Sequence, residues 1–572
     1  MNKRLLFVVS LLMLVSMMLT ACGAATQAPA TEAPKPTEAP ATEVATEAPM
    51  FEGMSVVAPD CNYGTADSPA KLKSIEAVDA NTVKFTLCAP DPAFPSKVAF
   101  SVFSIQDKDF LDANAGDSVK MSEQSNGTGP YKVLEWVRGD HITFEANPEY
   151  WGGAPKVKTL IFRWSEQSAQ RLLELQSGTV DGVDNPAPED FDTIKADANL
   201  ALLPRAAGNI FYIGFNNKIK PFDDPKVRMA FSMAIDRQTI VDKYYPKGST
   251  VAQNFVPDFF APGFSKDITW NTYDPAAAKK MLTDAGFDFN QEIQLAFRNV
   301  VRSYLPTPDK VAQEIQGQLK ANLGITVKLE EMESTAFIDA TAAGEKGFYL
   351  LGWGMDYPDA TNFYDYHFAN ASNQQFGDLY PDLVKEINAA AVLSDPAQRQ
   401  VHYDKVNELI KELVPMIPVA HGGSATAYKA NVEGAHSSPL GNEVFAVMNN
   451  GTDQMVWMQS GEPAALWCSD ETDGETLRAC EQLADALLAF KVGGAEVEPG
   501  LAEKYEANTD LTEWTFTLRQ GVKFQNGATL DANDVVATYE SFWNAASPNH
   551  KGRTGTFEYF TTFFGAFLNV AK

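Results

Sequence analysis

The segment from Gly352 to Tyr357 is the part of this chain best able to hold a small charged molecule. It reads Gly-Trp-Gly-Met-Asp-Tyr, so that the carboxylate of Asp356 stands close to the aromatic rings of Trp353 and Tyr357. A carboxylate that faces a cation inside a closed cleft gains far more than one at a surface, because water no longer competes. The alternative is that Asp356 caps a turn before Pro358 and that Trp353 belongs to the core, since buried charges usually need a partner.

A second charged candidate is Arg302, in the segment Val301-Arg-Ser-Tyr-Leu-Pro306. The planar guanidinium of arginine can bind a carboxylate through two parallel hydrogen bonds. Arg298 lies close enough in sequence to leave the assignment between the two arginines open, and a solvated arginine is the ordinary alternative. A cleft with both charges would suit a zwitterion, whereas Asp356 alone would admit a cationic or neutral solute.

Signals for enzymatic chemistry are missing from the sequence. The six histidines are scattered and show no HExxH motif or metal-ligand spacing. No Gly-x-Ser-x-Gly elbow and no P-loop occurs. We therefore expect a protein that is not an enzyme and that needs no metal or other cofactor.

The first residues have the features of an export signal. Lys3 and Arg4 precede an apolar run from Leu5 to Leu19, which is short for a membrane span, and Leu19-Thr-Ala-Cys22 follows. Small residues before a lone cysteine match a bacterial lipobox, so we predict that residues 1–21 are a lipoprotein signal peptide and that Cys22 is lipidated. The alternative is an ordinary signal peptide in which Cys22 is incidental. Lipidation would anchor the exported protein to the outer face of the cytoplasmic membrane.

Residues 22–55 are predicted to form the lipidated cysteine and a linker. The unit Thr-Glu-Ala-Pro occurs at 31–34, 37–40 and 46–49, and such proline-rich, acidic sequence is typical of an extended, solvated spacer. The whole chain has 572 residues and a formal charge of −28. This acidic balance argues against nucleic acid as a partner.

Four cysteines remain once Cys22 is set aside. In an exported protein we expect them to form disulfides, and proximity in sequence favours the pairs Cys61–Cys88 and Cys468–Cys480 among three possible pairings. A metal site is the alternative, but no CxxC spacing supports it.

Helices and strands alternate through the middle of the chain, which predicts an α/β fold. Apolar residues at 311, 315, 319 and 323 form the stripe of a helix that ends at Gly324, and residues 325–329 read as the next strand. Strict alternation at 83, 85 and 87 and again at 514, 516 and 518 predicts two half-buried strands.

Several motifs resemble the family 5 extracellular solute-binding proteins, the dipeptide, oligopeptide and nickel receptors of ABC importers. They include Gly127-Thr-Gly-Pro-Tyr131, Tyr150-Trp-Gly-Gly153, Phe222-Asp-Asp-Pro-Lys-Val-Arg228 and Gly352–Tyr357. Gly127 and Gly129 read as turn residues at positive φ. The segments 498–505, 514–524 and 526–535 resemble an early part of the family, yet they stand at the end of this chain. The order suggests a circular permutation; a tandem gene pair cut out of frame is the alternative, although each motif is present only once.

The resemblance implies a two-lobed α/β clamshell of the periplasmic-binding-protein type with an extra third domain. Mapped onto this chain, the extra domain takes residues 60–155 and 499–572, the first lobe 156–217 and 426–498, and the second, ligand-binding lobe 218–425. In a permuted chain, Lys572 should lie near residues 60–75, and strands from both chain ends should share one sheet.

The resemblance also implies roles for the charged residues. In peptide-binding relatives the aspartate of the Gly352–Tyr357 motif pairs with the ligand's α-ammonium and the tryptophan lines the pocket, which gives these roles to Asp356 and Trp353, with Tyr357 beside them. Arg302 falls near the arginine that binds the ligand carboxylate, although serine follows it where the family has proline. The expected protein is a monomeric, membrane-tethered receptor that passes a peptide-like solute to ABC permease subunits. An oligosaccharide or other small solute, or a sensor without transport, is the alternative.

Overall fold

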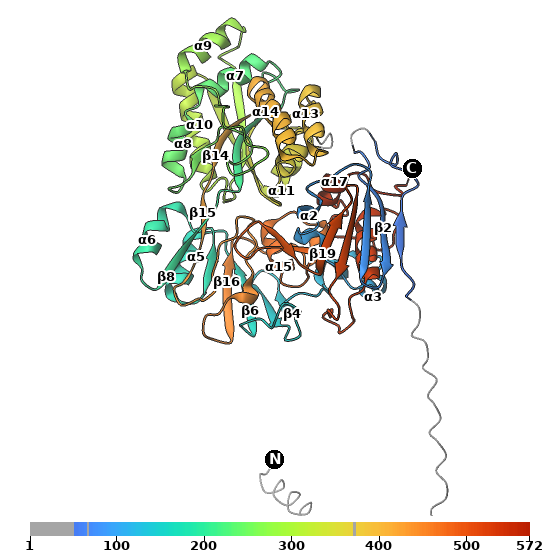
Figure 1. Cartoon of the computed structure of the whole chain (residues 1–572). Coiled ribbons are helices and arrows are strands. Elements are labelled where there is room, and N and C mark those ends of the chain that lie inside the picture. The colour runs from blue at the N-terminus through green and yellow to red at the C-terminus, as the bar shows by residue number, and fades with distance from the viewer. Residues whose placement is uncertain (1–50, 66–67, 370–372, 572) are drawn as a thin grey trace, which may run out of the picture. The chain divides into compact units, whose positions relative to one another are not determined.

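The structure is a computed structural model that describes residues 51–65, 68–369 and 373–571. The chain from Phe51 onward forms a compact unit. The predicted signal peptide, the lipidated Cys22 and nearly all of the predicted linker lie outside the described residues. Three sheets of five, six and seven strands and one two-stranded ribbon organise the described part (Figure 1).

The five-stranded sheet brings together the two ends of the described chain. Its strand order is β1 (Ser55–Val57), β2 (Leu72–Asp79), β3 (Thr82–Leu87), β20 (Glu513–Leu518) and β19 (Ala502–Ala507). β3 and β20 are antiparallel, with Phe85 paired to Trp514. Alternate residues of both strands are buried, which confirms the predicted alternation. Strands from opposite ends of the sequence therefore share one sheet, as predicted, and lie side by side as blue and red arrows in Figure 1.

Two helices from the end of the chain complete this part of the molecule. Helix α16 (Ala532–Trp543) packs against β2 and begins with a capping box formed by Asp531 and Asp534. Helix α17 (Glu558–Phe564) follows, and after it Ala566 N–H donates to the carbonyl of Pro69 at 3.3 Å. The end of the chain thus lies against residues near 70, as predicted, although Lys572 itself is not among the described residues.

The six-stranded sheet carries the segments that were predicted to bind ligand. Its order is β10 (Thr250–Val251), β14 (Met416–His421), β9 (Asn209–Phe215), β13 (Phe348–Gly354), β11 (Glu292–Arg298) and β12 (Thr326–Met332). β11 and β12 are parallel and are connected through α10 (Pro308–Leu323). The residues of the predicted stripe on α10 are buried, and Gly324 ends the helix with φ +82°, which confirms that prediction.

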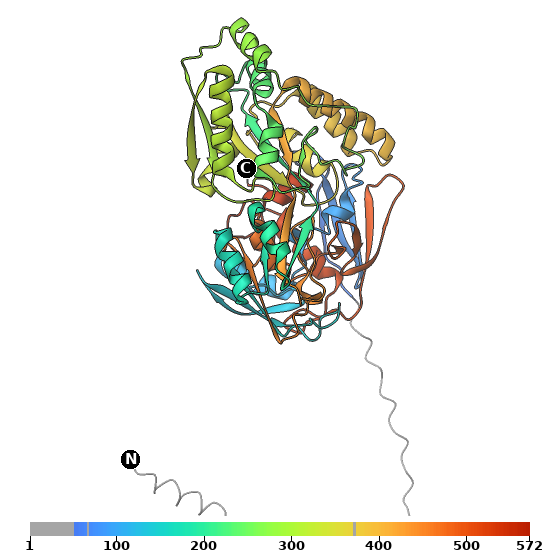
Figure 2. The same cartoon turned by 90° about the vertical axis from the view of Figure 1, so that its left-hand side faces the viewer.

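Helices pack in two groups around the six-stranded sheet. α10 contacts α7 (Pro225–Ala234), α8 (Arg237–Tyr244) and α9 (Pro275–Asp284), whereas α13 (Pro381–Ala391) and α14 (Pro396–Leu413) pack on each other, apart from the first group in both views (Figures 1 and 2). The other α-helices are α2 (Phe94–Lys97), α3 (Lys108–Ala113), α4 (Ser118–Glu123), α5 (Ser168–Ser177), α6 (Phe191–Ala196), α11 (Ser334–Ala342), α12 (Thr361–Tyr364) and α15 (Gly474–Cys480). The two-stranded ribbon consists of β17 (Leu488–Phe490) and β18 (Val497–Pro499).

The seven-stranded sheet moves two of the predicted domain boundaries. Its order is β4 (Tyr131–Val137), β5 (His141–Ala146), β6 (Thr159–Trp164), β16 (Gln454–Gln459), β7 (Gly182–Asp184), β15 (Ser424–Lys429) and β8 (Leu200–Arg205). β4 and β5 were predicted in the extra domain. However, β5 pairs with β6, so the backbone N–H and C=O groups at that edge of the β4–β5 hairpin are hydrogen-bonded within the seven-stranded sheet. β9 was predicted in the first lobe, yet it pairs with β13 and β14 in the six-stranded sheet.

The chain crosses between the six- and seven-stranded sheets at two adjacent points. One crossing leads from β8 to β9 and the other from β14 to β15. The side chain of Asn209 joins them, because its amide donates to the carbonyl of Gly422 at 2.7 Å and accepts from the N–H of Gly422 at 2.8 Å. Two short connections tied by one side chain are suited to act as a hinge.

The cysteines confirm one predicted pairing and contradict the other. Cys61 and Cys88 form a disulfide. Cys468 and Cys480 are both free and buried, so the predicted second disulfide is not formed. Each of their thiols lies 3.9 Å from a backbone carbonyl oxygen, that of Leu477 and that of Ala465 respectively, within an apolar cluster. They pack as small apolar side chains.

Candidate functional site

Asp356 lies two residues after the end of β13 and is held by neutral donors. Its Oδ1 accepts from the Tyr559 hydroxyl at 2.8 Å, and its Oδ2 accepts from the Asn362 amide at 2.8 Å. Asn362 lies in α12, and its Oδ1 also accepts from the backbone N–H of Asp356 at 3.0 Å. No lysine, arginine or histidine of the described residues forms an ion pair with Asp356. The carboxylate is thus fixed in place but has no counterion.

Burial dominates the electrostatics of this carboxylate. Desolvation raises the pKa of Asp356 to about 7, although the hydrogen bonds from Asn362 and Tyr559 oppose the shift, and the nearby Glu558 adds to it. An arriving cation would remove much of this penalty. A buried acid whose pKa is raised in this way is typical of a functional site.

Asp359, three residues further on, is the contrasting case. Its carboxylate binds both ends of the Arg399 guanidinium, at 2.7 and 2.8 Å, and accepts from the backbone N–H of Thr361 at 3.0 Å. Burial would raise its pKa, but Arg399 lowers it. Asp359 therefore performs the turn-capping role that was the alternative for Asp356.

Trp353 contributes a half-buried aromatic wall next to Asp356. Its ring stacks on Tyr366 with centroids 4.5 Å apart and meets His367 edge-on at 4.9 Å. Burial lowers the pKa of His367 to about 3, so this histidine is neutral at physiological pH. The Tyr366 hydroxyl donates to Glu558 at 3.1 Å, which places the start of α17 beside the wall.

Tyr357 differs from the prediction that grouped it with Asp356 and Trp353. It is 2% exposed, its ring meets Phe563 of α17 at 4.8 Å, and its hydroxyl bonds to Thr361 at 3.0 Å. The side chain belongs to the core beside the five-stranded sheet. The structure thus gives Tyr357 a packing role.

The two candidate arginines have different partners. Arg302, in the loop between β11 and α10, lies 3.3 Å from Asp473 and 3.5 Å from Glu475, which is in α15. Arg298 donates to Ser334 at 2.9 Å and to the Tyr304 hydroxyl at 3.0 Å. Arg302 is therefore the arginine that reaches from the six-stranded sheet to the elements around the seven-stranded sheet.

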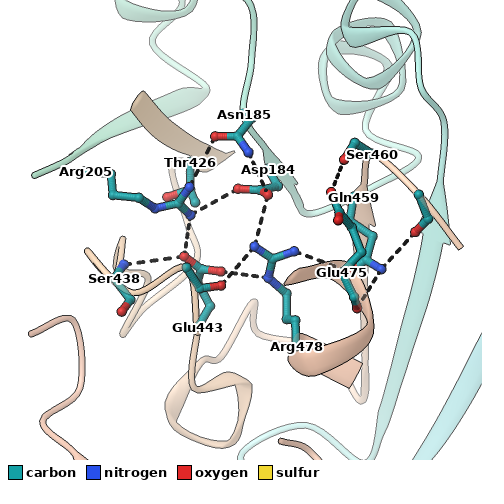
Figure 3. Close-up of polar contacts among 12 residues, drawn as sticks. Asp184, Asn185, Arg205, Thr426, Ser438, Glu443, Gln459, Ser460, Glu475 and Arg478 are labelled. Atoms are coloured by element: carbon teal, nitrogen blue, oxygen red, sulfur yellow. Dashed lines mark hydrogen bonds and ion pairs between the residues drawn. The ribbon is translucent and has the colours of Figure 1, made fainter. Parts of the chain in front are cut away.

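A buried ionic network connects Arg478 of α15 to three charged residues from other segments, and it was not foreseen from the sequence (Figure 3). Arg205 binds Asp184 at 3.0 Å and Glu443 at 2.6 Å, and Arg478 binds the same two carboxylates at 3.0 and 2.9 Å. All four side chains are at most 6% exposed. Burial opposes the ionised form of Glu443, but the two arginines lower its pKa. We call these four residues the ionic square.

Tyr559 and Asn362 were also missed. Tyr559 is 203 residues from Asp356 in the chain, so no sequence pattern links them. Asn362 is six residues away, in a helix that carries no distinctive motif. A surface hollow of about 570 Å³ lies between α8 and α10 and includes none of these residues. Among the described residues, no three acidic, histidine or cysteine side chains form a cluster able to hold a metal ion.

The fold and this arrangement define a class: the two-lobed α/β clamshell of the periplasmic binding proteins. In the part of the chain that the structure describes, no helix has the length and apolar character needed to span a membrane. The profile of the bacterial extracellular solute-binding proteins, family 5 Middle, matches residues 39–375 and 496–559. The chain belongs to this family, whose members are binding proteins and not enzymes.

Relatives of known function are similar over most of their length. The dipeptide-binding protein of Escherichia coli is 28% identical over 69% of this chain and 72% of its own. Di/tripeptide-binding protein 1 of Pseudomonas aeruginosa is 31% identical over 66% and 72% of the two chains. The crystal structure of a dipeptide-binding protein from Pseudoalteromonas in complex with Met-Leu superposes with a TM-score of 0.62 at 26% identity, over 66% of this chain and 76% of that one.

Proposed function

We propose that this protein is a lipid-anchored receptor that captures a peptide-like solute between its two lobes and delivers it to an ABC permease. The observation that carries the proposal is Asp356, a fixed and partly buried carboxylate without a counterion. The α-ammonium of a peptide has the charge and the hydrogen-bond donors that this carboxylate requires. The similar proteins named for dipeptides and tripeptides support this choice of ligand.

Four side chains would form the amino-terminal subsite. Asp356 would pair with the ammonium, while Tyr559 and Asn362 keep its two oxygens oriented. The Trp353 ring would cover the first residue of the ligand on one side, in keeping with its half-buried position. No covalent step is needed, because capture depends only on pairing charge and excluding water.

Release to a permease would use the two crossings between the sheets. A ligand that contacts both lobes favours the closed arrangement, and closure would report occupancy to the transporter. The lipid on Cys22 and the linker up to residue 55 would keep the receptor at the membrane. Replacing Cys22 with serine should move the protein from the membrane fraction to the soluble exported fraction; equal membrane retention would contradict the anchor.

We also propose that the chain is circularly permuted. The family profile matches two separate segments, and β20 from the second pairs with β3 from the first, as a permutation requires. A reordered gene that encodes residues 452–571, a short linker and residues 53–451 tests this. It should fold and bind the same ligand with equal affinity, whereas a failure to fold would count against the permuted relationship.

The function is tested by native mass spectrometry of protein purified without refolding. We expect co-purified peptides with free amino ends, and loss of these peptides in Asp356→Asn. An exposed acid, Asp453, is the matched control, and Asp453→Asn should retain the peptides. A bound sugar in place of peptide would refute the proposal.

A further inference from the structure

Arg302, the arginine predicted to bind a ligand carboxylate, already forms ion pairs with two acids of the protein itself. Its two terminal nitrogens lie 3.3 Å from Asp473 and 3.5 Å from Glu475, although these acids are 171 and 173 residues away in the chain. The arginine comes from the loop after β11, and the acids come from the start of α15. The contact therefore joins elements of the two sheets.

Both acids are held by their own neighbours and do not depend on the arginine for their position. Asp473 is the N-cap of α15 and accepts from the backbone N–H and the hydroxyl of Thr476, each at 3.1 Å. Glu475 accepts from the Ser460 hydroxyl, and its carbonyl accepts from Gln459 at 3.1 Å. The carboxylates would stay in place if Arg302 turned towards a ligand.

The charges around Arg302 do not favour the binding of a further carboxylate. Two acids share one guanidinium, and the side chain of Glu475 is only 8% exposed. Burial and the neighbouring Glu475 raise the pKa of Asp473, whereas Arg302 and the backbone N–H of Thr476 oppose the shift. A ligand carboxylate that approached Arg302 would compete with two acids that already contact the same guanidinium.

We propose that the site reads the amino end of a peptide and does not read its carboxylate, because Asp473 and Glu475 neutralise Arg302 internally. This inference rests on the proposed function and narrows its ligand class. The ligands are peptides with a free α-ammonium whose carboxyl end is free, amidated or extended by further residues. Asp473 and Glu475 determine this specificity, because they occupy Arg302. The role of Arg302 is to hold the two lobes together through these ion pairs.

Titration calorimetry with three probes tests the inference on the native protein: Met-Leu, its C-terminal amide and its N-acetyl form. We expect Met-Leu and the amide to bind within threefold of each other, and acetylation to weaken binding at least 100-fold. The inference is overturned if amidation alone weakens binding tenfold or more and this difference disappears in Arg302→Met. Weak or absent binding of all three probes would instead refute the proposed function, and this inference with it.

Removing one of the two acids should create a preference for a free ligand carboxylate, and a variant tests this. Asp473→Asn retains the helix cap but removes one of the two acids, so Arg302 keeps only Glu475 as an internal partner and attracts a ligand carboxylate more strongly. The free acid should then bind at least fivefold more tightly than the amide, and the added substitution Arg302→Met should abolish this preference. Asp453→Asn removes the same charge from a remote, exposed position and should leave the ratio at its native value. An unchanged ratio in Asp473→Asn would contradict the role of the acids.

Discussion

The ionic square and the Asp356 site are two groups of desolvated charges with opposite arrangements, the square buried and Asp356 partly buried. In the square, each of two carboxylates meets two guanidinium groups, and the charges cancel. At Asp356, a single carboxylate meets only the hydroxyl of Tyr559 and the amide of Asn362. A buried charge with all of its partners supports the fold, whereas a desolvated carboxylate without a counterion is the site that we propose for a ligand cation.

The largest expected effect comes from breaking the square. Arg478→Met leaves two buried carboxylates with one guanidinium, and we expect it to lower the free energy of unfolding by about 3–5 kcal/mol. Urea denaturation measures this change. The control Lys158→Met removes a charge that is 77% exposed and should cost less than about 0.5 kcal/mol. Equal stability of the two variants would mean that the square does not support the fold.

The second effect is on binding and not on stability. Asp356→Asn keeps the shape of the side chain but removes the charge, so peptide affinity should fall by about 2–4 kcal/mol, roughly 30- to 1000-fold. The unfolding free energy should stay the same or rise, because the protein no longer buries an unpaired acid. Calorimetry and urea denaturation measure both quantities on the same preparation. A variant that loses stability as well as affinity would erase the distinction between the two regions.

The third prediction concerns pH. Since burial raises the pKa of Asp356 to about 7, peptide affinity should fall roughly 25-fold between pH 7.5 and pH 5.5 as the acid takes up a proton. The contribution to the stability of the empty protein has the opposite sign. It is fully present below the unfolded pKa near 3.8 and is lost as pH rises through about 7.

Two comparisons isolate this effect. His367 and His421 stay neutral in this range, because burial lowers their pKa values to about 3 and about 4. Asp356→Asn should show a flat affinity profile over the same interval. A slope that persists in this variant would assign the titration to another group, of which Glu558 is the nearest.

The smallest effect is expected from Tyr559→Phe. The ring keeps its contacts with Phe100 and Phe563, but Asp356 loses one hydrogen bond, so affinity should fall by about 1 kcal/mol, roughly fivefold. The midpoint of the affinity–pH profile should also move to higher pH, because the lost bond favours the ionised acid. A fall in affinity with no movement of the midpoint would indicate that Tyr559 acts through packing alone.

Local patterns predicted much of the fold. The alternation at 83–87 and 514–518 identified β3 and β20, and the stripe from Val311 to Leu323 identified α10, because side-chain direction follows the backbone period. The motif containing Gly127 and Gly129 was located correctly but explained wrongly. Neither glycine has positive φ; a Cβ at Gly129 would lie 2.3 Å from the carbonyl carbon of Leu483, so close packing requires the residue.

The candidate site was predictable only in part. Asp356 and Trp353 could be proposed together because they lie in one short segment, and their role in binding stays a prediction. Whether a charge has a partner depends on residues brought together by the fold, so the sequence could not separate Asp356 from Asp359 or foresee the ionic square, whose members lie at 184, 205, 443 and 478. The same reason explains why the acids beside Arg302 were missed.

In a receptor tethered as proposed, the Cys61–Cys88 disulfide would transmit mechanical tension into the body of the protein. Tension along the linker would enter the body at β1, an edge strand held by three residue pairs with β2. Beyond β1, the disulfide carries the load from Cys61 directly to Cys88, which follows β3 in the middle of the sheet. The hairpin of β2 and β3 is thereby bypassed, so a pull at the proposed anchor would load the centre of the five-stranded sheet instead of the six-stranded sheet.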